Sequence, residues 1–173
     1  MEQAKRFIFG LSPWVSGTVM GVTMVLQIVL SFFLINPAAV PLLQWVGYAA
    51  WTLSAVFGIA PIITFRVKGG VPKGKSYIHT TVLVDSGVFA IVRHPQYLAG
   101  VLINLAATLI TQHWLIGLLG LVAAGITIAD AFKADRDGIE KFGTEYERYM
   151  QRVPRMNFVA GIVRLARRGK SST

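Results

Sequence analysis

The chain contains no cysteine and few charged residues. Without cysteine there is no disulfide framework, no thiolate nucleophile and no Cys-ligated metal site, and no metal site is predicted. Charged residues make up 14% of the 173 residues, whereas roughly 25% is usual in a soluble globular domain. The mean hydropathy is +0.57. The composition therefore favours a membrane protein.

Two long stretches, residues 7–65 and 94–128, contain no Asp, Glu, Lys or Arg. The sequence "INPAAVP" (35–41) divides the first stretch, because Asn-Pro and a second proline interrupt a helix. The sequence "TQHW" (111–114) divides the second stretch into a tight helical hairpin. A helix of about 20 apolar residues crosses roughly 30 Å of hydrocarbon. We predict four spans, near residues 14–35, 43–65, 95–111 and 114–132.

The predicted fold class is an all-α integral membrane protein, organised as a single membrane domain with additional cytoplasmic and interfacial helices. All 17 Lys and Arg residues fall in 1–13, 66–93 and 133–173, on one side of the four spans. Basic residues in short loops stay cytoplasmic, so both termini are predicted inside. The formal charge of +9 then indicates anionic lipid headgroups as partners, and no nucleic acid.

The sequence "GGVPKGKS" (69–76) matches the G-x-x-x-x-G-K-[ST] phosphate-loop pattern. That motif functions where a buried strand enters the loop and a helix leaves it. Here a predicted membrane span precedes it, and the chain returns to the membrane too soon for a parallel sheet. We interpret it as a flexible basic loop whose Lys68, Lys73 and Lys75 contact lipid headgroups. A mobile cover over a nearby site is the alternative.

The sequence "RHPQY" (93–97) stands where the third span begins. Pro95 is well suited to the first helical position, which places His94 at the cap. Free N–H groups of the first turn beside Arg93 and His94 would form an anion site. The alternative is that Arg93 and Tyr97 are interfacial anchors and His94 only a cap.

Charged residues continue from the fourth span. Asp130, Lys133, Asp137 and Glu140 recur at helical spacing, which predicts one long helix ending near Gly143. A solvated face is the usual meaning of such a pattern. Further on, "FVAGIVRLARR" (158–168) combines an apolar body with basic residues and is predicted to lie on the inner leaflet.

Two of these segments together resemble a known family. "LVDSGVFAIVRHPQYLAG" and "IEKFGTEYERYMQRVPR", separated by one hairpin, resemble the C-terminal half of the isoprenylcysteine carboxyl methyltransferase and phospholipid methyltransferase superfamily, over about residues 80–155. The resemblance implies an integral membrane methyltransferase that uses S-adenosylmethionine. Its acceptor would be lipophilic and enter from the bilayer at the cytoplasmic face: a lipid amine, a prenylcysteine-like carboxylate or another hydrophobic molecule.

The resemblance also implies a cytoplasmic cofactor-binding region, at 77–97 and 130–155. The methionine carboxylate suits the helix start beside Arg93 and His94, and the adenosine suits an apolar and aromatic wall. The residues implied to bind S-adenosylmethionine are Thr81, Val82, Leu83, Val84, Phe89, Arg93, His94, Pro95, Gln96 and Tyr97.

The catalytic residues depart from the family pattern. Prenylcysteine methyltransferases have an Arg and a Glu twelve and eight residues before the Phe-Gly pair, where this chain has Asp130 and Ala134. Asp130 suits an amine better than a carboxylate, and the neighbouring Asp135 and Arg136 are candidates to replace the missing pair. A carboxylate acceptor needs no base, whereas for an amine or thiol Asp135 or Glu140 is a candidate.

Two other functions are compatible with this scaffold. A sterol-type membrane reductase would use NADPH, although such chains carry many more spans. A non-catalytic membrane protein would bind a lipid or a partner at the same place. The sequence leaves the methyl acceptor and the oligomeric state open.

Overall fold

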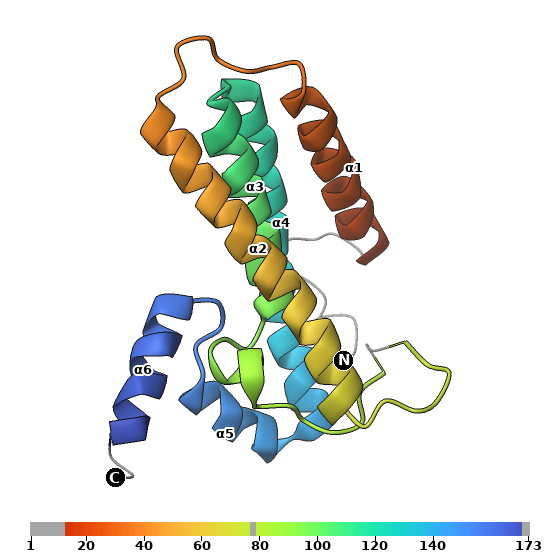
Figure 1. Cartoon of the computed structure of the whole chain (residues 1–173). Helices are drawn as coiled ribbons and strands as arrows, with labels where there is room; N and C mark the ends of the chain where they lie inside the picture. Colours follow the sequence, from red (N-terminus) through yellow and green to blue (C-terminus); the bar gives the residue numbers. More distant parts are fainter. Residues whose placement is uncertain (1–12, 77–78, 171–173) are drawn as a thin grey trace. The chain divides into compact units, whose positions relative to one another are not determined.

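The computed structural model describes residues 13–76 and 79–170, and the regular structure in these ranges consists of helices joined by turns and loops (Figure 1). No β-strand occurs in them, which confirms the all-α class. The helices are α1 (Pro13–Ser31), α2 (Pro41–Lys68), the 3-10 helix η2 (Gly87–Ala90), α3 (Pro95–Thr111), α4 (Trp114–Phe142), α5 (Thr144–Arg152) and α6 (Phe158–Lys170).

The chain forms two compact units. Unit 1 comprises Met1–Ser54 and Gly100–Phe132, and unit 2 comprises Ala55–Ala99 and Lys133–Thr173. Helices α2, α3 and α4 each contribute residues to both units.

Two helices are long and apolar enough to cross a membrane, namely α2 with 28 residues and α4 with 29. Helices α1 and α3 are also apolar but shorter. Helix α1 ends at Ser31, before the predicted limit at residue 35, because the chain turns there towards Asn36. The Asn36 N–H donates to the Thr111 carbonyl at 2.9 Å, which fixes the turn.

In unit 1, α3 and α4 form the predicted hairpin, with a turn of only two residues (Figure 1). Gln112 adopts φ 49°, a left-handed conformation that is uncommon for a residue other than glycine. Its side chain accepts a hydrogen bond from the Val40 N–H at 2.9 Å and donates one to the Val40 carbonyl at 2.8 Å. These two bonds hold the turn in place.

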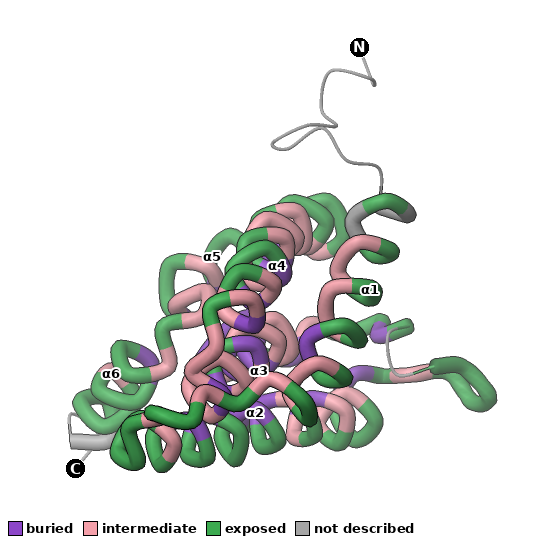
Figure 2. The backbone as a smooth tube through the Cα atoms, turned by 90° about the horizontal axis from the view of Figure 1, so that it is seen from above, coloured by how far each residue is buried: buried purple, intermediate pink, exposed green. Residues whose placement is uncertain are grey.

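The outer surface of unit 1 is apolar. Exposed positions run along most of α1 and the first half of α2 (Figure 2), and Phe33 and Trp45 are 77% and 71% exposed. Contiguous apolar surface of this extent is rare on soluble monomers and is usual where lipid surrounds a protein. Together with the lengths of α2 and α4, it supports a membrane protein.

In unit 2, α4 ends at Phe142, close to the predicted limit. Gly143 follows with φ 57°, a conformation that glycine adopts easily. Helix α5 buries Tyr146 and Tyr149, and with Val153 they form the core of this unit. The residues packed around that core are Leu83, Ile139, Phe142 and Met150.

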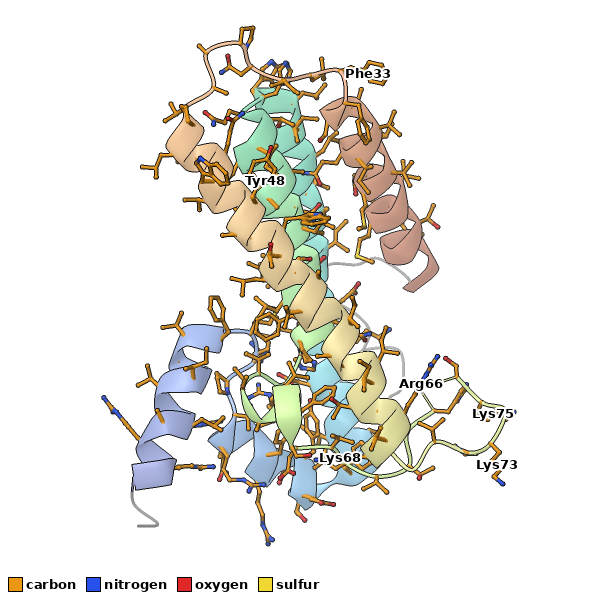
Figure 3. All side chains as sticks on the ribbon, in the orientation of Figure 1. Phe33, Tyr48, Arg66, Lys68, Lys73 and Lys75 are labelled. Atoms are coloured by element: carbon orange, nitrogen blue, oxygen red, sulfur yellow. The ribbon has the colours of Figure 1, made fainter. Side chains whose placement is uncertain are left out.

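The basic loop after α2 closes on its own base. The Gly69 carbonyl accepts hydrogen bonds from the Thr81 and Val82 N–H groups. Lys73 and Lys75 project outward near the tip of the loop (Figure 3). Helix α2 enters the loop and no helix begins at Ser76, so the segment lacks the strand and helix that a phosphate loop requires.

Candidate functional site

Asp135 on α4 is the centre of a polar cluster in unit 2. It is 3% exposed and lies among the side chains of Arg93, His94, Tyr146 and Arg155. We call these five residues the Asp135 cluster. They come from the α3 start, α4, α5 and the segment before α6, so one carboxylate joins four parts of the unit.

Each oxygen of Asp135 accepts more than one hydrogen bond. Oδ1 lies 3.2 Å from Arg93 Nε, 2.7 Å from His94 Nε2 and 3.0 Å from the Tyr146 hydroxyl. Oδ2 lies 2.9 Å from Arg93 Nη2 and 2.7 Å from Arg155 Nε. The Arg93 contact is bidentate, the strongest geometry for such a pair. This set of donors stabilises the ionised carboxylate and makes it a weak base.

Arg93 also fixes the segment after α5. Its Nη1 donates to the carbonyls of Met150 and Val153, and its backbone N–H donates to the Pro154 carbonyl at 3.0 Å. The His94 N–H donates to the Arg155 carbonyl at 3.1 Å. Residues 93–94 and 154–155 are therefore paired through their backbones as well as through Asp135.

Two buried tyrosines complete the surroundings of the cluster. Burial, followed by the charge and hydrogen bond of Asp135, raises the pKa of Tyr146 well above its ordinary value. Burial likewise raises the pKa of Tyr149, whose hydroxyl donates to the Phe89 carbonyl at 2.7 Å. Both hydroxyls stay protonated and act as donors. The Tyr146 ring packs directly on Gly138, where a Cβ would lie 2.4 Å from Tyr146 Cζ, so the glycine leaves room for the ring.

The predicted cofactor residues divide by exposure. Thr81 and Val82 are exposed and bonded to the loop base at Gly69, whereas Val84 and Phe89 are buried. The Phe89 ring packs on Phe65 with centroids 4.4 Å apart, so it belongs to the core of unit 2. Leu83, Gln96 and Tyr97 are partly exposed.

Helix α3 begins at Pro95, as the sequence predicts, and His94 immediately precedes it. The His94 and Tyr97 rings meet edge to face with centroids 5.6 Å apart. Arg93 and His94 are both bonded to Asp135, so the predicted anion site beside this helix start already holds a carboxylate of the protein itself.

A family model for phospholipid methyltransferases matches residues 42–133, more than half of the chain. The chain belongs to the phospholipid methyltransferase family. No curated protein and no solved structure matches it. The family implies methyltransferase activity on lipid-like substrates.

The match to the phospholipid methyltransferase family includes Arg93 and His94 but ends before Asp135. The remaining sequence candidates are not members of the Asp135 cluster. Arg136 and Glu140 are exposed on α4, and Asp130 is partly buried on the part of α4 that belongs to unit 1. Their catalytic roles stay predictions.

Sequence reasoning missed two members of the cluster, Tyr146 and Arg155. Both stand in the "FGTEYERYMQRVPR" segment that carried the resemblance, but neither was assigned a role. The signal available was the tyrosine of the Phe-Gly-x-Glu-Tyr motif, three residues after Gly143. Nothing in the sequence singles out Arg155 from its basic neighbours.

Proposed function

We propose that the protein transfers a methyl group from S-adenosylmethionine to a lipophilic acceptor at the cytoplasmic face of a membrane. The observation that carries the proposal is the meeting of two motifs at Asp135. Arg93 and His94 come from the first motif and Tyr146 and Arg155 from the second, and all four bond to one carboxylate. Family membership supplies the reaction class.

The residues between Thr81 and Tyr97 would hold the cofactor. Leu83, Gln96 and Tyr97 are partly exposed, which offers apolar, amide and aromatic surface of the kinds that an adenosine and an amino acid require. When bound, S-adenosylmethionine supplies an electrophilic methyl group whose sulfonium charge disperses during transfer. The chain's own contribution is alignment and exclusion of water.

Asp135 acts as a positioning residue in this proposal. It holds Arg93 and His94 directly before Pro95, and so fixes the position at which α3 begins. Gln96 and Tyr97 lie in the first turn of that helix. Its five hydrogen bonds make it a poor proton acceptor. An amine or thiol acceptor would therefore lose its proton to another group, for which the exposed Glu140 remains the candidate.

Four membrane spans, contributed by α1 to α4, are part of the proposal. At 1.5 Å per residue the 19-residue α1 and the 17-residue α3 reach about 26–29 Å, close to the hydrocarbon thickness of about 30 Å. The one-sided distribution of Lys and Arg then puts both termini in the cytoplasm. In this arrangement the chain is a single membrane domain, and α6 is an interfacial helix.

Calorimetric titration of the purified protein in detergent tests the cofactor directly. Binding of S-adenosylmethionine and S-adenosylhomocysteine is expected. Tyr97→Ala removes partly exposed aromatic surface from the first turn of α3, and should weaken binding about tenfold or more. Lys75→Ala on the exposed loop is the control and should leave binding unchanged.

If the protein binds neither S-adenosylmethionine nor S-adenosylhomocysteine, the proposal is contradicted. Tight binding of NADPH would favour a reductase instead. A positive result leads to a second experiment, in which the protein is incubated with methyl-labelled cofactor and a total lipid extract. Identification of the labelled lipid names the acceptor.

A further inference from the structure

Helix α6 carries several apolar residues on its exposed side. Val159 and Ile162 are 58% and 51% exposed. The opposite side packs on the segment before α3, where Gly161 is buried and a Cβ on it would come within 2.0 Å of the Ile91 carbonyl oxygen. Arg164, three residues on, faces the same way and donates from Nη2 to the Ala90 carbonyl at 2.9 Å. A helix that turns arginine inward and apolar residues outward suits a membrane interface.

A pocket of about 390 Å³ lies on the inner side of α6. Its volume falls in the range of roughly 300–1,000 Å³ that small organic ligands occupy, and so exceeds the needs of a bare ion. Three arginines and one aspartate line it, which leaves two positive charges in excess. Its charged lining residues are Arg152, Arg164, Arg168 and Asp85, and its larger apolar lining residues are Val153 and Leu165.

The arginines of this pocket are incompletely paired. Arg152 forms an ion pair with Asp85 at 3.5 Å, and both side chains are half-exposed. In the described part of the chain, no carboxylate forms an ion pair with Arg164 or Arg168. Arg164 Nε is buried and makes no hydrogen bond within residues 13–76 and 79–170. Burial, and next the charge of Arg168, lower the pKa of Arg164. An anion in the pocket would offset the repulsion between Arg164 and Arg168.

The charge of the pocket also decides which anion suits it. S-adenosylmethionine carries a net positive charge, from a sulfonium and an ammonium against one carboxylate, so the two excess charges of the pocket disfavour it. A phosphate ester is an anion, and the guanidinium fork matches its oxygens. The apolar wall of Val153 and Leu165 and the exposed apolar side of α6 add a reason for a lipid.

We propose that this pocket binds the phosphate group of an anionic phospholipid, held by Arg164 and Arg168, with Arg152 released from Asp85 as a third ligand. This lipid is bound separately from the methyl acceptor, and the proposal does not depend on methyl transfer.

Native mass spectrometry of the full chain in a neutral detergent tests the proposal with phosphatidylglycerol as the probe. The unmodified chain should retain phosphatidylglycerol, and diacylglycerol, which lacks the phosphate, should not be retained. The double variant R164Q/R168Q should bind phosphatidylglycerol about tenfold or more weakly, because two charge-assisted contacts are lost. R168Q alone keeps the Arg164 bond to Ala90, so it should weaken binding while α6 stays docked.

The control variant R148Q/R167Q removes the same charge from two exposed residues that do not line the pocket. It should change binding less than about threefold. Equal weakening by both double variants would overturn the proposal in favour of diffuse electrostatic attraction. Full displacement of the lipid by millimolar inorganic phosphate would show that the pocket binds free phosphate rather than a lipid, and would overturn the proposal. Displacement by S-adenosylmethionine would assign the pocket to the cofactor and would also overturn it.

Discussion

The buried polar side chains of the two units have different hydrogen-bond partners. In unit 1, residues 13–54 and 100–129 carry no charged side chain, and their buried polar side chains bond mainly to helix carbonyls. Gln27, for example, donates to the carbonyls of Asn104 and Ile116 at 3.2 and 3.1 Å. In unit 2 the buried side chains of Arg93 and His94 instead bond to a buried carboxylate, Asp135.

This difference in hydrogen-bond partners determines how strongly each unit is destabilised when a buried polar side chain is removed. Helix carbonyls in unit 1 keep their backbone partners when a side chain is removed, so a lost contact leaves little unsatisfied. The cations of unit 2 share one carboxylate, so its loss leaves buried positive charge without a partner. Replacing a buried polar residue by an apolar one should therefore destabilise unit 1 less than unit 2.

Asp135→Ala should have the largest effect. It leaves Arg93 uncompensated and buried, and breaking a buried ion pair in this way costs about 3–5 kcal/mol. Tryptic cleavage after Arg148 and Arg152 should become at least tenfold faster, as α5 loses its anchor. Asp137→Ala, on the exposed face of the same helix, should change the cleavage rate little. Equal rates for the two variants would show that the cluster does not hold unit 2 together.

Tyr146→Phe should have the second largest effect. It removes one donor to a carboxylate, and a hydrogen bond to a charged group contributes about 1.5–3 kcal/mol. Tyr149→Phe is the matched comparison, because it removes a 2.7 Å bond to the neutral Phe89 carbonyl, worth about 1 kcal/mol. Thermal unfolding in micelles should give the lower midpoint for Tyr146→Phe. The reverse order would mean that the four remaining donors make the Tyr146 bond redundant.

Gly138→Ala should follow, as a balance of two terms. Alanine favours a helix over glycine by about 1 kcal/mol, whereas displacing the Tyr146 ring costs about 1–3 kcal/mol. Gly125→Ala on the same helix has no neighbour within 4 Å, so only the favourable term applies to it. Thermal unfolding should show a loss of stability at Gly138 and a gain or no change at Gly125. Equal shifts would mean that Tyr146 moves aside freely.

Local signals predicted most of the fold. Pro95 marked the start of α3, the sequence 111–114 marked the hairpin, and Gly143 marked the end of α4. Each of these boundaries depends on the backbone preferences of a few adjacent residues, which a sequence displays directly. The limit of α1 was less well predicted, because Ser31 precedes an apolar run that continues without a helix breaker to Asn36.

The cluster was only partly predictable, because its bonds join residues far apart in the chain. Arg93 and Asp135 were each singled out, but for separate roles, and their pairing over 42 residues has no local signal. The resemblance implies that Phe89 lines a cofactor wall, which stays a prediction, and its packing against Phe65 is a tertiary contact that the family pattern does not display. Which of several basic residues reaches a carboxylate depends on tertiary packing, and Arg155 is the example here.

Gln27→Leu should have the smallest effect, and it tests the comparison from the side of unit 1. Leucine fills a similar space, and the two carbonyls that Gln27 contacts remain bonded within α3 and α4. Under the proposal that α1 to α4 span a membrane, hydrogen bonds between such helices contribute on average about 0.6 kcal/mol, so thermal unfolding should change little. Gln27→Ala leaves a cavity and should cost more, which would identify shape rather than hydrogen bonding as the stabilising factor. A loss at Gln27→Leu as large as that at Asp135→Ala would remove the distinction between the two units.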